Sequence, residues 1–462
     1  MRNGGSAPVG FHLVRYGTPA DQRYLLRPFL ETYDQIVINA NIVALMPAAL
    51  AAFLSQHAKG KSYFLDPQTH AFQHDPTNLE ARREGDSFQI RKSIQNLLNR
   101  YGDPAATAVE SNHRGVRPND FPNPRVIERF CQRVLQFQRN AIAEQANQSD
   151  AAKYFKFLEK KGKIKAPKFT PAVLVAPYFC MKTSTFHDWI DINIACARSS
   201  IGDSGGDPIA VEIALYRDLL TNETLRANLI EKYRTLKPAT FLVWIDGFSE
   251  HDAAGYELEA LVRLFNGLGM TAPVVNLYGG FFSVALKRLS IVPALAGICH
   301  GLEYGESREF VPVGGGMPVA KFYYPSMHKR LPFRDALRAV RAQNALHSAA
   351  DFHRIVCACD ECKAVIRTNP DSDFAAYGRT RPISFMRRNQ PIAKEFPLPE
   401  TRDHCVNHYM WCKDREYNHN LLLIDLIRDL DVTHRLGRNL GLETVAYAEV
   451  WRSILEAARD QT

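Results

Sequence analysis

Short apolar runs alternate with longer amphipathic stretches along most of the chain. The runs are rich in β-branched and aromatic residues and end in Gly, Pro or a polar residue, which is typical of buried strands. The stretches between them repeat their apolar positions with the period of a helix. Strands separated by helices pair in parallel through right-handed crossovers. Eight such runs are present, at residues 9–16, 35–40, 62–66, 172–177, 240–246, 273–278, 296–300 and 319–325.

Eight strands are the number that closes a (β/α)8 TIM barrel, which is therefore the predicted α/β fold. An open doubly wound sheet is the alternative. The chain between the third and fourth runs is too long for one crossover, and segments 88–101 and 123–147 have helical periodicity. The pattern predicts a barrel over residues 1–350 with a helical insertion at about 75–170, and a C-terminal segment over 351–462. We expect the insertion to border the mouth of the barrel.

The composition is that of a soluble globular protein. The chain has 462 residues, of which 46% are hydrophobic, so it can bury a large core. Its longest apolar stretch, 42–54, is shorter than the roughly 18 residues that cross a bilayer. The first residues carry no apolar segment followed by a cleavage site. We expect a cytoplasmic protein that has no membrane partner.

Positive charge favours a polyanionic partner. The formal net charge is +8, and basic residues gather in segments 82–100, 153–168 and 379–394. Any one of these segments is also explained as a solvated helix face or loop. Together with the net charge, the three segments favour nucleic acid as a partner.

A cluster of cysteines predicts a metal site near the C-terminus. The chain has nine cysteines, and Cys357, Cys359 and Cys362 fall within six residues. A tight turn with this spacing presents three thiolates to one tetrahedral zinc ion. The fourth ligand must come from elsewhere, and the sequence leaves several candidates open. The candidates all lie within residues 404–412. If this segment is helical, its two candidate histidines share one face and its two candidate cysteines share another. The candidates are His404, Cys405, His408 and Cys412, of which we prefer His408. Four protein ligands make the zinc structural.

These features together resemble the tRNA-guanine transglycosylase superfamily, whose members exchange a guanine in a nucleic acid for a 7-deazaguanine. Residues 35–45 (QIVINANIVAL) resemble the second strand of that family and its Asn-containing loop. The segment from Phe64 to Gln73 resembles its Asp-Ser-Gly-Gly-Phe-Gln motif and keeps Asp66, an aromatic residue and the Gln, without the Gly pair. Tyr278, Gly279 and Gly280 resemble its Gly-Gly motif, and Cys357, Cys359, Cys362 and His408 resemble its zinc ligands.

One departure from the family pattern concerns the nucleophile. The family has a nucleophilic aspartate at the end of its eighth strand, and the matching run at 321–325 has no carboxylate. The first substitute is Asp246, at the predicted C-terminal end of the fifth strand, where barrel enzymes do their chemistry. The second is the loop after the seventh strand, which contains His300, Glu303 and Glu306.

The resemblance implies a covalent exchange reaction. One carboxylate captures C1′ of the sugar, and a second group manages the proton of the base. We assign Asp246 as the nucleophile and Asp66 as the acid/base or base-orienting group, and the order could be reversed. For both carboxylates, capping of the following helix is the structural alternative. The residues assigned to substrate binding are Tyr278, Gly279, Gly280, His300 and Glu303, with the two glycines exposing their amides to the base.

The predicted activity is exchange of guanine in DNA for 7-cyano-7-deazaguanine (preQ0). The departures, the long insertion and the lack of an evident C-terminal RNA-binding module make the chain look like the branch of the family that acts on DNA. A tRNA-guanine transglycosylase and a noncatalytic nucleic-acid-binding barrel of the same superfamily are the alternatives. Helper proteins such as an ATPase are possible partners. Base exchange in duplex DNA requires that the target nucleotide be flipped out.

Overall fold

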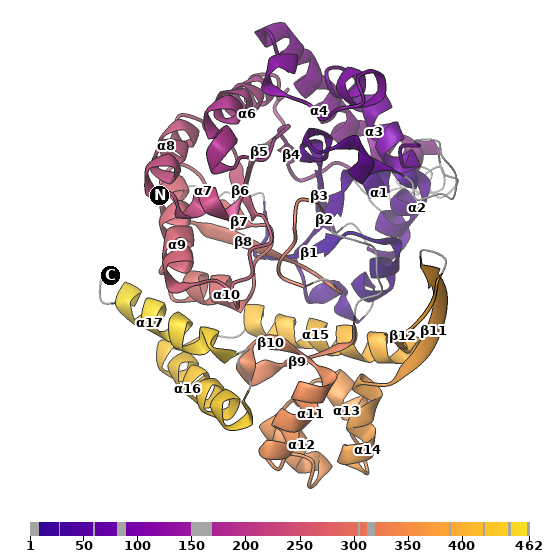
Figure 1. The fold of residues 1–462 in the computed structure, drawn as a ribbon, viewed down its shortest axis with the longest axis vertical. Coiled ribbons are helices and arrows are strands. Elements are labelled where there is room, and N and C mark those ends of the chain that lie inside the picture. The colour runs from indigo at the N-terminus through magenta and orange to yellow at the C-terminus, as the bar shows by residue number, and fades with distance from the viewer. Residues whose placement is uncertain are drawn as a thin grey trace, which may run out of the picture.

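A nearly closed barrel of eight parallel strands forms the centre of the molecule, which we describe from a computed structural model (Figure 1). The strand order is β3-β2-β1-β8-β7-β6-β5-β4. At the seam between β3 and β4, the backbone N–H of Ala172 donates to the carbonyl of Tyr63 at 2.8 Å. The strands are β1 (His12–Tyr16), β2 (Gln35–Asn39), β3 (Ser62–Asp66), β4 (Leu174–Val175), β5 (Ile209–Leu215), β6 (Thr240–Ile245), β7 (Val274–Asn276) and β8 (Leu295–Gly301). The structure describes residues 9–26, 28–58, 61–80, 89–148, 169–303, 305–311, 319–387, 390–418, 421–441 and 445–459.

The predicted barrel is confirmed, but two strand assignments were wrong. The pattern missed β5, because Glu212 interrupts its apolar run and the run continues directly into helical sequence. The run at 319–325 forms β9 (Lys321–Tyr324), which pairs antiparallel with β10 (Lys329–Pro332) outside the barrel. The eighth barrel strand is therefore β8, which the sequence pattern placed seventh. An apolar run shows that a strand is buried, and it does not show which sheet the strand joins.

Side chains alternate between two hydrophobic layers along the barrel strands, as the period of two requires. Leu13, Val37 and Phe64 belong to the layer inside the barrel. Val14 and Ile38 belong to the larger layer between the strands and the helices around them. The same alternation places every second residue of β5 inside the barrel, and this positions Glu212 between Ala210 and Ala214 of the inner layer.

Helices surround the barrel, and the sequence between β3 and β4 contributes some of them as predicted. The 25-residue helix α4 contacts both α2 and α6, so this insertion belongs to the outer helical layer. The basic run at 153–168 and residues 82–88 lie outside the described residues. The helices are α1 (Ala40–Leu45), α2 (Pro47–Ala52), α3 (Lys92–Tyr101), α4 (Pro124–Gln148), α6 (Phe186–Gly202), α7 (Arg217–Thr221), α8 (Glu223–Arg234), α9 (Gly255–Gly269) and α10 (Phe281–Arg288).

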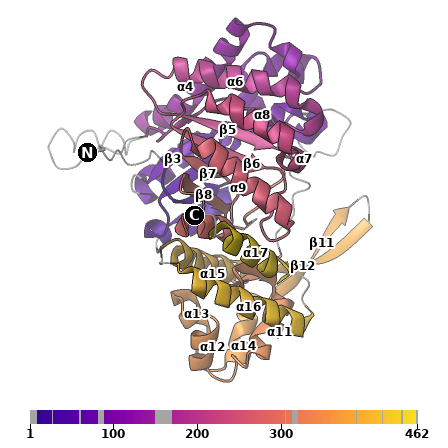
Figure 2. The ribbon, with the colours of Figure 1, turned by 90° about the vertical axis from the view of Figure 1, so that its left-hand side faces the viewer.

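A second unit is inserted between the last barrel strand and the helix that covers it. Figures 1 and 2 show this unit below the barrel, with helix α15 (Pro399–Asn418) between the two. Tyr417 of α15 stacks on His12 of β1 at 3.9 Å between ring centroids and donates to the carbonyl of Ile298 in β8 at 3.4 Å. α15 thus takes the place of the helix expected after β8. The inserted elements are β9, β10, α11 (Phe333–Ala342), α12 (Ala349–Ile355), α13 (Asp360–Val365), α14 (Pro370–Phe374), β11 (Thr380–Arg387) and β12 (Gln390–Pro397).

Two further helices, α16 (Leu423–Leu440) and α17 (Tyr447–Arg459), follow α15 and pack on each other; α16 also packs on α11 of the insert and α17 on α9 of the barrel. Trp451 of α17 donates from its indole N–H to the carbonyl of Glu250 at 3.0 Å, in the loop after β6. In the described part of the chain, no helix is both long enough and apolar enough to cross a membrane.

Candidate functional site

The predicted metal ligands converge at one buried point between the insert and the barrel helix α15. The sulfurs of Cys357, Cys359 and Cys362 and one ring nitrogen of His408 lie within 4.8 Å of one another. The Nδ1 atom of His408 is 3.4 Å from the Cys359 sulfur and 3.3 Å from the Cys362 sulfur. Three thiols and an imidazole are a donor set that suits a tetrahedral metal ion. The cluster can therefore hold a metal.

Local backbone structure explains how the short cysteine segment forms half of this cluster. Cys359 occupies the N-cap position of α13, and its sulfur accepts from the backbone N–H of Cys362 at 3.4 Å. The sulfur of Cys357 accepts from the N–H of Cys359 at 3.5 Å. N–H groups directed at sulfur stabilise thiolates, so the turn before α13 is organised to present negative sulfur to a cation.

The structure also selects the histidine. The Nε2 atom of His408 is 2.6 Å from the carbonyl oxygen of Tyr323 in β9, which fixes the proton on Nε2 and leaves Nδ1 free for a metal. His404 faces elsewhere, with its Nδ1 atom 2.6 Å from a carboxylate oxygen of Glu361. We expected His404 and His408 to share one face of the helix, but only His408 of these two lies at the cysteine sulfurs. The second residue of α15 beside it is Cys412, whose sulfur lies 3.9 Å from that of Cys357.

A second candidate site lies inside the C-terminal end of the barrel, around Asp66. This last residue of β3 is 1% exposed and accepts from Arg15 Nη1 at 2.9 Å and from the Tyr178 hydroxyl at 2.8 Å. Pro67 ends the strand, and Gln68, with a φ of 54°, returns its N–H to Asp66 at 3.0 Å. Burial would raise the pKa of Asp66, but the Arg15 guanidinium overrides this effect and lowers the pKa, so Asp66 is ionised.

Glu212 adds a second carboxyl group to this interior. It is 1% exposed, and within the described part of the chain neither of its side-chain oxygens has a hydrogen-bond partner. Burial and, after it, the negative charge of Asp66 raise the pKa of Glu212 well above its ordinary value against the opposing effects of Arg15 and Tyr178, which favours the neutral form of the group. Arg15 Nε, Arg15 Nη2 and Asn39 Nδ2 are likewise buried and lack partners among the described residues. Buried polar groups are normally satisfied, so unpaired donors and acceptors that gather at one place indicate a ligand site.

Aromatic rings form the wall of this interior. The Arg15 guanidinium lies over the ring of Tyr278, 4.4 Å from its centroid, and Tyr278 contacts Trp244 at 5.0 Å between centroids. Phe310, which follows β8 in the chain, packs edge-on against Trp244 at 4.8 Å and is 4% exposed. The loop that carries Phe310 therefore lies over the mouth of the barrel.

Asp246 lies at the same end of the barrel as Asp66, because both follow the C-terminal ends of parallel strands. Its Oδ1 atom accepts from the backbone N–H of Phe310 at 2.6 Å. Burial raises the pKa of Asp246, and the N–H of Phe310 opposes the shift. Burial raises the pKa of the Cys180 thiol, and the negative charges of Asp246, Glu212 and Asp66 raise it further.

The backbone amides of Gly279 and Gly280 donate to groups of the protein itself, whereas we expected them to face a base. The N–H of Gly279 donates to the carbonyl of Cys299 at 3.1 Å. The N–H of Gly280 donates to the carboxyl group of Glu250, which is 2% exposed and caps α10. The same carboxyl group accepts from the Ser283 hydroxyl at 2.5 Å. A Cβ atom on Gly280 would lie 2.5 Å from a carboxylate oxygen of Glu306 and 2.9 Å from one of Glu250, so both carboxylates would have to shift to admit a larger residue.

The structure places His300 and Glu303 away from Asp66. His300 faces the outer layer, where its Nε2 atom is 2.8 Å from that of His12 and its ring contacts Tyr409 of α15. Glu303 forms an ion pair with Arg402, also on α15. Neither residue shares a contact with the interior cluster around Glu212, so the structure does not bring them together with the other assigned residues.

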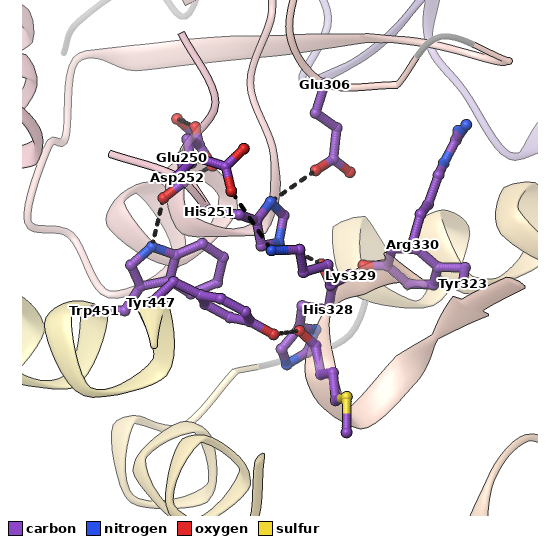
Figure 3. A network of polar contacts seen from close by, with 12 residues as sticks. Glu250, His251, Asp252, Glu306, Tyr323, His328, Lys329, Arg330, Tyr447 and Trp451 are labelled. Atoms are coloured by element: carbon purple, nitrogen blue, oxygen red, sulfur yellow. Dashed lines mark hydrogen bonds and ion pairs between the residues drawn. The ribbon is translucent and has the colours of Figure 1, made fainter. Parts of the chain in front are cut away.

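Ion pairs tie the loop after β8 to the helix that carries His408. Glu306 accepts from Lys413 Nζ at 2.6 Å and lies 4.0 Å from His251 Nδ1 (Figure 3). Arg330 of β10 donates to the carbonyl of Glu303 at 3.0 Å and to the carbonyl of Leu302. Phe310 of the same loop contacts Trp244 at the barrel mouth, so described residues of this loop contact both the inserted unit and the interior site.

Replacing Glu212 by glutamine is expected to stabilise the protein. A carboxyl group whose pKa is higher in the folded than in the unfolded state must take up a proton on folding, and this costs stability at every pH above about 4.3, the unfolded value. Glutamine has no such cost. The gain in unfolding free energy of Glu212→Gln over the unchanged protein, measured with urea at pH 5, 7 and 8, should increase with pH.

The exposed Glu128→Gln in α4 is the matched control for this series and should show a change within about 0.5 kcal/mol at each pH. A Glu212→Gln protein that is less stable than the unchanged protein at pH 8 would show that Glu212 is ionised and paired, against the description given above.

Comparison of the chain with protein-family models, with curated proteins and with solved structures finds no match in any of the three.

Proposed function

We propose that the chain is a transglycosylase that exchanges guanine in DNA for a 7-deazaguanine such as preQ0, with a structural zinc ion at the Cys357, Cys359, Cys362 and His408 cluster. The observation that carries this proposal is the set of unpaired polar atoms inside the barrel. Glu212 in its neutral form offers one acceptor and one O–H donor, while Arg15 and Asn39 offer donors. The edge of a guanine-type base carries N–H donors beside a carbonyl acceptor, which is the complement of that set.

The aromatic wall supports the same class of ligand. Tyr278 and Trp244 are rigid, buried rings beside the polar atoms, and flat bases stack on such surfaces. A flipped nucleotide is held by hydrogen bonds to its base edge and by stacking between aromatic side chains. Phe310 occupies the mouth, so entry of a base requires the loop that carries it to move.

The exchange itself needs one carboxylate at the sugar. In the first half, the carboxylate attacks C1′, the glycosidic bond breaks and guanine leaves with its electron pair and a proton. In the second half, the incoming base loses its N9 proton and its nitrogen attacks C1′, so the carboxylate is released. Among the candidates, Glu303 and Glu306 each form an ion pair with a cation on α15, whereas the hydrogen bond of Asp246 among the described residues comes from a backbone N–H. Asp246 therefore remains our nucleophile, and Asp66 orients the base.

The position of β8 as the eighth barrel strand bears on the noncatalytic alternative. The eighth barrel strand is β8, and the carboxylates that follow it are Glu303 and Glu306, both in ion pairs. A barrel in which these carboxylates serve only structure would bind nucleic acid without exchanging a base. This observation keeps the noncatalytic barrel as the second candidate.

An adduct experiment separates these functions. Purified protein is incubated with labelled preQ0 or guanine and either duplex DNA or tRNA, and incorporation is measured together with the protein–nucleic acid adduct that survives denaturation. We expect label in DNA, an adduct with the unchanged protein, and no adduct with Asp246→Asn. Glu303→Gln and Glu306→Gln should retain it.

The remaining outcomes of this experiment are distinct. An adduct that persists in Asp246→Asn and disappears in Glu306→Gln would move the nucleophile to the loop after β8. Incorporation into tRNA alone would replace the DNA substrate, and absence of incorporation into either polymer would favour the noncatalytic barrel.

A further inference from the structure

Strands β11 and β12 form a ribbon of their own. They pair antiparallel from Thr380 opposite Pro397 to Arg387 opposite Gln390, and the two-stranded sheet they form is separate from the barrel and from the β9–β10 pair. Figures 1 and 2 show the ribbon projecting away from the rest of the insert. Eight residues per strand give it a length of about 27 Å. Apart from Pro397, which is buried, the ribbon residues whose side chains are described are exposed or half-buried.

The two faces differ in charge. Residues that alternate along a strand share a face, and directly paired residues share it across the strands. By this register, Arg381 and Phe396 form one pair and Ile383 and Lys394 form the next on the same face. The opposite face carries the pairs Thr380–Pro397, Pro382–Glu395 and Ser384–Ala393. One face is therefore basic and apolar, and the acidic residue lies on the other.

The basic side chains of this face are available to a partner. Arg381 and Lys394 are exposed, and neither forms an ion pair with any residue that the structure describes. Ile383 and Phe396 beside them are half-buried. In the sequence, two further arginines, Arg387 and Arg388, come at the end of β11 and directly after it.

The ribbon is poorly suited to bind another protein strand. Strand addition needs a free row of backbone N–H groups, and proline has none. Pro382 and Pro397 interrupt β11 and β12, and Pro391 follows Gln390 at the start of β12. Prolines on edge strands are a device that prevents such pairing. The exposed cations therefore point to a polyanion and not to a peptide.

We propose that the β11–β12 ribbon docks into the major groove of duplex DNA, with Arg381 and Lys394 on the phosphates; this rests on the DNA substrate of the proposed function. The major groove of B-form DNA is about 12 Å wide and admits a two-stranded ribbon. The major groove of A-form RNA is deep and narrow and excludes one. The ribbon thus selects DNA over the helical parts of tRNA and holds the duplex while a base enters the barrel.

The test is binding of a 25-base-pair fluorescent DNA duplex, followed by anisotropy at several salt concentrations. Each lost phosphate contact lowers the slope of log K against log salt by about 0.9. Arg381→Ala with Lys394→Ala should therefore lower the slope by about 1.8, which corresponds to binding on the order of 50-fold weaker at 0.1 M salt. Both side chains are exposed, so the fold should be retained.

The matched control removes two cations at the other end of the molecule. Arg234 and Lys237 are exposed and precede β6, at the N-terminal end of the barrel strands. Arg234→Ala with Lys237→Ala changes the net charge equally and should leave the slope unchanged. A folded duplex and a folded tRNA are compared in the same assay, and only binding of the duplex should depend on the ribbon.

Duplex binding tests the ribbon and base exchange tests the transglycosylase, so the two can fail separately. Equal duplex binding by the ribbon variant and the unchanged protein overturns the ribbon assignment, and exchange into DNA then still supports the transglycosylase. Weaker duplex binding by the ribbon variant together with no exchange by the unchanged protein retains the ribbon and removes the transglycosylase. An unchanged protein that does not bind the duplex, or a control variant as weak as the ribbon variant, overturns the ribbon.

Discussion

Removing the metal is expected to detach the inserted unit from the barrel while the barrel strands remain folded. The cluster joins the turn before α13 to His408 on α15, so a bound ion would cross-link the two units. In small zinc-binding peptides, a structural zinc ion contributes roughly 10 kcal/mol or more of apparent folding free energy. Cys362→Ser should therefore reduce bound zinc from one equivalent to none and lower the melting temperature by more than about 10 °C.

Hydrogen exchange locates the effect of this change. Amides of α12, α13 and β9 should lose protection in Cys362→Ser, while those of β2 and β6 keep it. Cys131→Ala, which removes a buried cysteine of α4 far from the cluster in sequence, should leave the zinc content unchanged. Stoichiometric zinc in Cys362→Ser, or none in the unchanged protein, would exclude this cluster as the metal site.

Asp66→Asn is expected to lose base exchange and to destabilise the fold. The guanidinium of Arg15 is 3% exposed and has Asp66 as its ionic partner, so the variant leaves a buried charge without compensation. Removing one member of a buried ion pair costs about 3–5 kcal/mol. Urea unfolding at pH 7 measures the loss, and Asp191→Asn, in an exposed pair with Lys232, should cost less than about 1 kcal/mol.

The pH dependence of Asp66→Asn follows from the same contacts. The pKa of Asp66 is lower in the folded than in the unfolded state, so its stabilising effect is complete above about pH 4 and is lost as the pH falls through the folded value. The difference in unfolding free energy between the unchanged protein and Asp66→Asn should therefore shrink on acidification. A difference that is constant from pH 7 to pH 3 would show that Asp66 is not ionised in the folded protein.

Local features were predictable from the sequence, and features that depend on long-range packing were not. The spacing of Cys357, Cys359 and Cys362 indicated a metal turn because these residues need only a few residues of backbone to converge. The choice of His408 required β9, since the carbonyl of Tyr323 orients the imidazole, and no local pattern reveals that contact.

The interior site shows the same limit. Asp66 was found at the end of a recognisable strand, but Glu212 was missed because an ionisable residue in an apolar run hides the strand that carries it. Arg15 lies in a strand that was correctly predicted, and its role as the partner of Asp66 depends on pairing across 51 residues. For Arg15, a charged residue at an inward position of a predicted strand was the available signal.

The position of α15 has a consequence for how the protein is made. The helix that covers β8 and β1 begins about 100 residues after β8 ends. At a synthesis rate of about 5–20 residues per second, the outer face of these two strands stays bare for roughly 5–20 s after the last barrel strand has left the ribosome. During that interval His12 and Ile298 lack their contacts with Tyr417, so this face of the two strands is exposed on the nascent chain.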